Sequence, residues 1–154
     1  MRCKITPIIS LAWLGNPHLE KSFLLDADSR QLVTFRDQLR ALLRNAALDE
    51  KASGEVLLAV QEALTNVLRH AYENSSGKIE VAFLEDNEKI KISICDFGKK
   101  FDLTKVPDPV LPRDKPGGLG VYLIKKLMDQ VDYDTSFQEG NLLHLIKFKN
   151  RTHK

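Results

Sequence analysis

The sequence predicts a two-layer α/β sandwich, in which helices cover one face of a mixed, mostly antiparallel sheet. The first reason is size, because 154 residues suit one domain of ordinary dimensions. The second is composition, since 43% hydrophobic and 29% charged residues are typical of a chain that folds around a core. The third is order, because strand-like and helix-like segments are grouped along the chain. We expect one domain at 19–150, after an extension at 1–18 and before a tail at 151–154.

Helices are predicted where apolar residues recur at intervals of three and four. Asp28 and Asp49 can each cap a long helix, because a side-chain oxygen at this position accepts a hydrogen bond from the first turn. The turn-forming run 74–77 ends the second of these helices. A third helix is expected to begin at the glycine-rich run 117–120 and to extend through Met128.

Strands are predicted where apolar side chains alternate with polar ones. The polar, turn-rich linker in the middle of the chain indicates that the two strands beside it form an antiparallel hairpin. Residues 97–116 show neither the helical nor the strand periodicity and contain four prolines. A loop of this length in a compact domain is usually a lid or a binding loop. The expected strands are 22–25, 78–84, 89–95, 131–137 and 142–148.

Charge and composition exclude several classes of protein. A net charge of +2 gives no surface that would coat nucleic acid or a membrane. Two cysteines, Cys3 and Cys95, are too few for a disulfide framework or a metal cluster. The apolar run 8–14 is too short to span a bilayer, and no signal-peptidase site follows it. We therefore expect a cytoplasmic protein with no direct nucleic-acid or membrane partner.

The second predicted helix carries polar residues at four-residue intervals. Glu62, Asn66 and His70 would lie along one helix face. A carboxylate and a carboxamide placed this way can act on neighbouring atoms of one ligand, the first as a base and the second as an oxygen donor to a hard cation. The alternative is a partly exposed polar stripe. We expect His70 to hold the helix end rather than to act chemically.

A short acidic motif ends the hairpin. In Asp96-Phe97-Gly98 the carboxylate can accept a hydrogen bond from an exocyclic amine such as that of adenine. The glycine would let the backbone approach a flat ring. The alternative is a strand-ending aspartate followed by a turn. The same letters occur in the magnesium loop of protein kinases, but the other motifs of that fold are absent from this sequence.

The glycine-rich run Gly117-Gly118-Leu119-Gly120 opens the third predicted helix. A helix start presents unpaired backbone N–H groups and the positive end of the helix dipole, which together favour phosphate. Arg113 and Lys115 precede it and supply positive charge. The alternative is a flexible hinge. The run is not a Walker A loop, because it lacks the lysine and hydroxyl residue of that motif.

Together and in this order, the three stretches resemble the motifs of the GHKL (Bergerat-fold) ATPase family. The resemblance is greatest to its anti-sigma-factor serine/threonine kinases of the RsbW and SpoIIAB type. The stretch from Glu62 to Tyr72 resembles the N-box, Asp96-Phe97-Gly98 the adenine box, and 117–129 the phosphate box. The similarity covers 19–149. This chain has Lys100 where many relatives have a second glycine, and Gly140-Asn141-Leu142 where some place a nucleotide-contacting threonine.

The resemblance implies a Bergerat fold that binds ATP and Mg²⁺. Asn66 would coordinate the Mg²⁺, and Glu62 would be the general base. Asp96 would bind the adenine amine, with Gly98 packed beside the ring. The other nucleotide-binding residues, which would offer charge or backbone N–H groups to the phosphates, are Arg113, Lys115, Gly117, Gly118, Leu119 and Gly120.

The function implied is a Mg-ATP-dependent serine/threonine protein kinase that acts as an anti-sigma factor. It would phosphorylate a STAS-domain anti-anti-sigma protein and bind a sigma factor, as a homodimer. Glu62 beside Asn66 favours this function, since nucleotide binding alone needs only the asparagine. One alternative is a non-enzymatic, nucleotide-gated binding module. A histidine-kinase-like catalytic domain is a weaker one, because His18 lies in a Gly-Asn-Pro loop and not in a dimerising helix.

Overall fold

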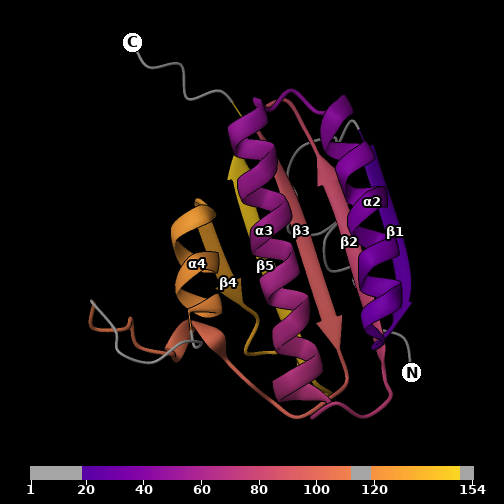
Figure 1. Cartoon of the computed structure of the whole chain (residues 1–154), viewed down its shortest axis with the longest axis vertical. Coiled ribbons are helices and arrows are strands. Elements are labelled where there is room, and N and C mark those ends of the chain that lie inside the picture. Colours follow the sequence, from indigo (N-terminus) through magenta and orange to yellow (C-terminus); the bar gives the residue numbers. More distant parts are fainter. Residues whose placement is uncertain (1–18, 112–118, 150–154) are drawn as a thin grey trace.

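The computed structural model describes residues 19–111 and 119–149, in which a five-stranded sheet carries helices on one face (Figure 1). The strand order is β1-β2-β3-β5-β4. The predicted two-layer fold is confirmed. All four strand pairings in these ranges are antiparallel, so the parallel pairing expected of a mixed sheet is not found there. The strands are β1 (Leu19–Asp26), β2 (Lys78–Glu85), β3 (Lys89–Asp96), β4 (Gln130–Tyr133) and β5 (Asn141–Phe148).

The predicted capping residues begin the first two helices. The Asp28 side chain accepts a hydrogen bond from the backbone N–H of Arg30, and the Asp49 side chain accepts one from that of Ala52. The third helix begins at Gly120, while 117–118 lie outside the described residues. The helices are α2 (Ser29–Asn45), α3 (Glu50–Asn66) and α4 (Gly120–Leu127).

The core lies between the sheet and the helices. Isoleucines of β3, such as Ile92 and Ile94, face Phe35 and Leu39 of α2 and the apolar face of α3 across this layer. Each large apolar side chain buried there stabilises the fold by about 1.5–3 kcal/mol. The result is a firm base from which the ends of α3, β3 and β5 position the polar residues considered next.

The structure departs from the sequence prediction after Asn66. The helix does not continue unchanged to the turn at 74–77, because residues 67–71 wind as a π-helical turn. The backbone N–H of Tyr72 bonds to the carbonyl of Val67, five residues earlier. Turns of this kind are frequent at functional sites.

Two other segments also differ from the prediction. β4 ends at Tyr133 and not at 137, because the Asp134 side chain bonds to the backbone and hydroxyl of Ser136 and forms a turn. Within the long loop, the Asp102 side chain caps a short 3₁₀ turn at Leu103–Lys105. The loop therefore has local order at its start.

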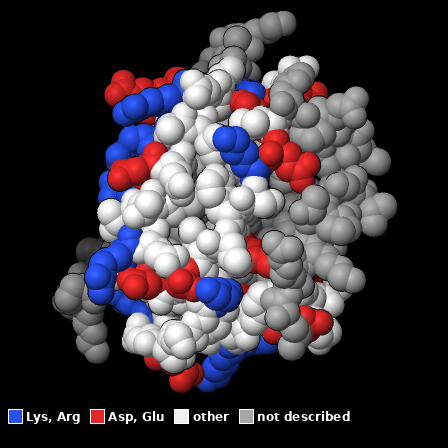
Figure 2. Space-filling view, turned by 90° about the vertical axis from the view of Figure 1, so that its right-hand side faces the viewer, with Lys and Arg blue, Asp and Glu red and all other residues white. Residues whose placement is uncertain are grey.

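The surface agrees with the low net charge. Viewed from the β1 edge, acidic and basic side chains are interspersed, and no broad field of one sign appears on this face (Figure 2). None of the helices within 19–111 and 119–149 is long and apolar enough to cross a bilayer.

Candidate functional site

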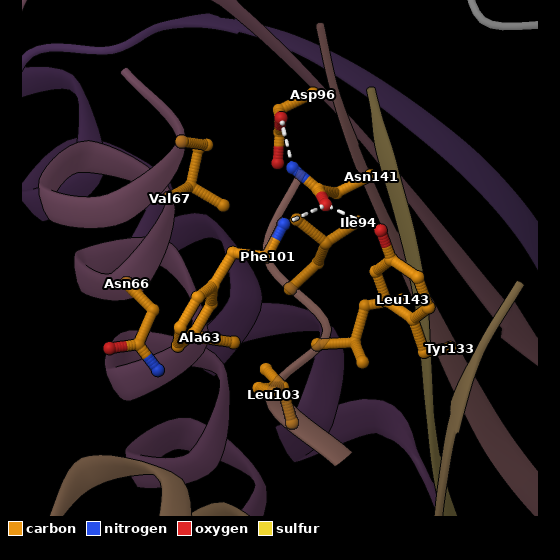
Figure 3. Close-up of a pocket in the computed structure, with 11 residues that line it drawn as sticks. Ala63, Asn66, Val67, Ile94, Asp96, Phe101, Leu103, Tyr133, Asn141 and Leu143 are labelled. Carbon is orange, nitrogen blue, oxygen red and sulfur yellow. Dashed lines mark hydrogen bonds between the residues drawn. The ribbon is translucent and has the colours of Figure 1, made fainter. Parts of the chain in front are cut away.

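A small cavity brings together two of the predicted site residues. It lies where the C-terminal end of α3 meets β3, β5 and the loop after β3, and its volume is about 30 Å³ (Figure 3). Asn66 and Asp96 both line it, together with Tyr133 and Asn141. Such a volume holds a water molecule but no purine ring.

Asp96 is a buried acceptor with one oxygen in use. Its side chain is 2% exposed, and Oδ1 accepts hydrogen bonds from the backbone N–H of Gly98 and from Nδ2 of Asn141, both at 2.9 Å. Burial raises the pKa of this carboxyl, and the two hydrogen bonds oppose that rise. Among the described residues none donates to Oδ2, so this oxygen can accept a bond from a ligand amine.

Gly98 lies where no side chain fits. A Cβ at this position would lie 2.4 Å from the carbonyl oxygen of Ala71, and the same carbonyl accepts a hydrogen bond of 2.7 Å from the N–H of Lys99. The loop backbone is thus held against the end of the π turn. The hydroxyl of Tyr72 accepts a bond from the N–H of Phe97 and donates to the carbonyl of Lys78, so it ties the loop after β3 to the start of β2.

Asn66 carries a buried donor without a partner. It is the last residue of α3, and its Nδ2 is buried with no hydrogen bond to any described residue. An unsatisfied buried donor costs about 1–3 kcal/mol. A ligand oxygen that accepts a hydrogen bond from Nδ2 would remove that cost, so the observation fits a site for a nucleotide phosphate.

Glu62 lies beside the start of α4. A Cβ on Gly120 would lie only 2.6 Å from Oε2 of Glu62, so the first residue of α4 contacts this carboxylate. Glu62 is one helical turn before Asn66 on α3. Leu119 occupies the N-cap position of α4, and its side chain makes no capping hydrogen bond there. The structure therefore places the described part of the third motif against the first.

Four predicted site residues cannot be placed. Arg113, Lys115, Gly117 and Gly118 lie outside the described residues, so their contact with phosphate stays a prediction.

His70 lies within the π turn that follows Asn66. It is exposed, and its ring stacks on that of Phe101 with centroids 4.4 Å apart. Its contact holds the loop against the helix end, and Lys125 of α4 holds the same loop through the carbonyl of Val106.

Asn141 is the residue whose contribution the sequence did not reveal. Its side chain is 6% exposed and makes four hydrogen bonds. Nδ2 donates to Oδ1 of Asp96, while Oδ1 accepts from the N–H of Phe101 and the hydroxyl of Tyr133 (Figure 3). Nδ2 also donates to the carbonyl of Lys99. The sequence marked this position only as the place where some relatives have a nucleotide-contacting threonine, and it gave no sign of the bond to Asp96.

The chain is similar to a known protein family over most of its length. The family model described as "Histidine kinase-like ATPase domain" matches residues 25–147. The chain belongs to this family. The match spans α2, α3, β2, β3, α4 and β4, and with them every predicted site residue.

Curated relatives of the family share a name. The serine-protein kinase RsbW of Listeria monocytogenes is 31% identical over 146 residues, covering 89% of this chain and 92% of the relative. RsbW of Oceanobacillus iheyensis is 36% identical over 103 residues, which is 61% of this chain and 64% of that protein, just under two thirds of its length. Both relatives are named as serine-protein kinases, which agrees with the enzyme class expected from the sequence.

A solved structure supports the fold. It contains the RsbU and RsbW domains of a Mycobacterium tuberculosis protein, with a TM-score of 0.60 and 20% identity. The match covers 86% of this chain and 32% of that one. The expected α+β architecture is therefore confirmed.

Proposed function

We propose that this protein is a Mg-ATP-dependent serine/threonine kinase whose substrate is a STAS-domain anti-anti-sigma protein. The observation that carries the proposal is the placement of Glu62, one turn from Asn66 and in contact with Gly120. A carboxylate between the carboxamide and a phosphate-binding helix start is where a kinase needs its general base.

The adenine end of the site would use groups that are already fixed. Oδ2 of Asp96 would accept a hydrogen bond from the adenine amine, and the backbone at Gly98 would pack beside the ring. Phe101 and Leu103 line the cavity and leave too little room for a purine. Nucleotide binding therefore requires this part of the loop to move aside, which would separate the rings of Phe101 and His70.

The phosphate end would hold the reacting groups. The side-chain oxygen of Asn66 would hold Mg²⁺, which neutralises charge on the triphosphate when bound. The N–H groups of Gly118, Leu119 and Gly120 would donate to phosphate oxygens, with Gly117 in the same run and with Arg113 and Lys115 beside them. Glu62 would accept the proton of the substrate hydroxyl while the hydroxyl oxygen forms a bond to the γ-phosphorus. The bond between the γ-phosphorus and the oxygen that leaves with ADP would break in the same step.

The proposal includes the partners implied by the relatives. As the resemblance to the RsbW and SpoIIAB type implies, the protein would bind a sigma factor and act as a homodimer. A sigma-factor partner would place the protein in the cytoplasm.

The experiment compares Glu62→Gln with the wild type in transfer of labelled phosphate from ATP to purified STAS-domain proteins. We expect transfer to fall by about 10²–10⁴-fold, the usual contribution of a general base, while ATP affinity measured by calorimetry changes by less than about threefold. Glu50→Gln, an exposed carboxylate in the first turn of α3, is the matched control and should behave as wild type.

Two outcomes would contradict the proposal. Equal losses of transfer and of ATP affinity in Glu62→Gln would make Glu62 a binding residue and not a base. Wild-type protein that binds ATP and a STAS partner but transfers no label would indicate the non-enzymatic, nucleotide-gated module.

A further inference from the structure

The side chain of Asn141 has used all of its hydrogen-bonding capacity. Nδ2 donates to Oδ1 of Asp96 at 2.9 Å and to the carbonyl of Lys99 at 2.8 Å. Oδ1 accepts from the N–H of Phe101 at 2.8 Å and from the hydroxyl of Tyr133 at 2.7 Å. A carboxamide offers two donor hydrogens and one oxygen with two lone pairs, so all four places are taken. The amide is therefore fixed in one orientation and has no group left to bond a nucleotide.

The strand register brings Asn141 to Asp96. The two residues are direct partners in the pairing of β3 with β5. Ile94 and Leu143, two positions further into the same strands, belong to the core under the helices, so alternation directs Asp96 and Asn141 to the cavity side (Figure 3). Gly140 permits the close approach, because a Cβ at this position would collide with the carbonyl oxygen of Asp96.

The two oxygens of Asp96 therefore differ. Oδ1 accepts from the N–H of Gly98 and from Nδ2 of Asn141, whereas no described residue donates to Oδ2. Asp96 also takes part in none of the ion pairs within 19–111 and 119–149. The two donors to Oδ1 thus determine how the carboxylate is turned and leave Oδ2 as its free acceptor.

Asn141 also favours the ionised form of this carboxyl. Burial raises the pKa of Asp96, and the bond from Asn141 opposes the rise more than the bond from Gly98 does. The titratable groups near Asp96 are the phenols of Tyr72 and Tyr133. Burial raises the pKa of both phenols, so they remain neutral and supply no charge.

We propose that Asn141 is a positioning residue that makes the site select adenine over 6-oxopurines, because it holds Asp96 with Oδ2 as a free acceptor. This inference rests on the proposed function, in which Asp96 binds the adenine amine. Adenine has an amine at C6, and hypoxanthine, the base of inosine triphosphate (ITP), has an oxo group there. An acceptor oxygen pairs with the amine but leaves the oxo group unpaired, and a buried polar group without a partner is what rejects the wrong base.

Loss of the Asn141 donor would give Asp96 a second way to bind. The buried carboxyl would hold a proton more readily, and a protonated carboxyl is a donor as well as an acceptor. It could then pair with the oxo group of hypoxanthine. The site would discriminate less between the two bases, whereas the loss of a merely structural residue would weaken the binding of both by the same factor.

The experiment compares Asn141→Thr with Asn141→Val by calorimetric titration with ATP and with ITP. The two variants have the same shape and both lose the amide bonds to the loop, but threonine keeps a hydroxyl that can donate to Asp96. The Cβ atoms of directly opposed residues lie about 4.5–5.5 Å apart, which is within reach of a hydroxyl.

We expect the wild type to bind ATP about 10-fold to 100-fold more tightly than ITP, since a hydrogen bond to a charged group has this effect. Asn141→Thr should keep this ratio within about threefold, and Asn141→Val should lower it by about 10-fold. Asn45→Val, at the exposed end of α2, is the control and should bind both nucleotides as the wild type does.

Two results would overturn the inference. One is an Asn141→Val protein that loses affinity for ATP and ITP equally and keeps the wild-type ratio. The other is a wild type that binds the two nucleotides equally. Neither measurement needs phosphotransfer, so a wild type that prefers ATP but transfers no phosphate would contradict the proposed kinase while agreeing with this inference.

Asp96→Asn decides the question if the variants at 141 do not fold. The new amide has to place its oxygen where Oδ1 lies, because the N–H of Gly98 and Nδ2 of Asn141 both donate there. Its NH₂ group then takes the place of Oδ2 and can donate to the oxo group of hypoxanthine. We expect this variant to bind ITP more tightly than ATP, the reverse of the wild-type order. A retained preference for ATP would mean that the amide has turned over, and would overturn the inference.

Discussion

The two ends of the candidate site differ in how their polar groups are satisfied. At the adenine end, Asp96 and Asn141 are buried and hydrogen-bonded to each other and to the loop backbone. At the phosphate end, Asn66 has a buried donor with no partner among the described residues, and Glu62 lies against a bare glycine. The first arrangement fixes a recognition group in place, and the second leaves groups available for a ligand.

This difference has an energetic meaning. A fully satisfied buried network strengthens and rigidifies the fold, whereas an unsatisfied donor weakens it. Substitutions at the adenine end should therefore lower stability and nucleotide binding together. Substitutions at the phosphate end should lower catalysis with little effect on stability.

The largest effect on stability is expected from Asn141→Leu. The substitution keeps the branched shape of the side chain but leaves Asp96, Tyr133 and the N–H of Phe101 each short of a partner. Because each such buried group costs about 1–3 kcal/mol, we expect the free energy of unfolding in urea to fall by about 3 kcal/mol or more. Asn45→Leu, at the exposed end of α2, is the control. A loss below about 1 kcal/mol would mean that the network contributes little.

Gly98→Ala should lower the stability of the fold less than Asn141→Leu, and it also acts at the adenine end of the site. Its Cβ would collide with the backbone carbonyl of Ala71, which cannot yield without moving the π turn. We expect a loss of about 1–3 kcal/mol in urea unfolding and weaker ATP binding by calorimetry. Gly54→Ala is a matched control, because nothing lies within 4 Å of its added Cβ and alanine favours a helix. Equal stability of the two variants would refute the close contact.

Gly120→Ala should separate catalysis from stability. Here the added Cβ meets the flexible carboxylate of Glu62, which can swing away. The unfolding free energy should change by less than about 1 kcal/mol, since alanine is tolerated in a first helical turn. Phosphotransfer should fall by about 10-fold to 100-fold, because displacement of a catalytic group on the order of 1 Å can have this effect. A drop in the apparent ATP affinity with unchanged turnover would argue against the assignment.

The smallest effect is expected in the pH dependence of stability. Burial raises the pKa of Asp96 in the folded state, so its contribution to stability is fully present below the unfolded pKa and is lost as the pH rises through the folded pKa. Asp96→Asn keeps an acceptor oxygen but does not titrate. Its free energy of unfolding relative to wild type should therefore increase from pH 3 to pH 7, while ATP binding is lost. Parallel pH profiles for the two proteins would contradict this.

The sequence predicted most of the fold because the signals are local. Asp28 and Asp49 cap helices through their own first turns, and the alternation in 78–84 and 89–95 predicts the hairpin as observed. The π turn was not predictable, since the spacing of His70 from Asn66 suits an α-helix equally well. β4 was predicted too long for a similar reason. The alternation of apolar and polar residues does not show where a strand ends in a turn such as that at Asp134.

The site was predicted less completely. Motifs identified Asn66, Asp96 and Glu62, but only the fold brings Asn141 to Asp96 across β3 and β5, from 45 residues away in the chain. The occupation of the cavity by Phe101 depends on the same tertiary contacts and has no local signal. Arg113 and its neighbours stay predictions.

The π turn makes the winding of the helix end a constraint in its own right. It contains one residue more than ordinary winding would need between Asn66 and Tyr72. If the same residues wound as a regular α-helix, everything after them would turn by the angle of that one residue, about 100°. The Ala71 carbonyl and the Tyr72 hydroxyl would then point away from the loop, even though every functional side chain is retained. The contacts at this end of the site thus depend on how residues 67–71 wind as well as on which side chains they carry.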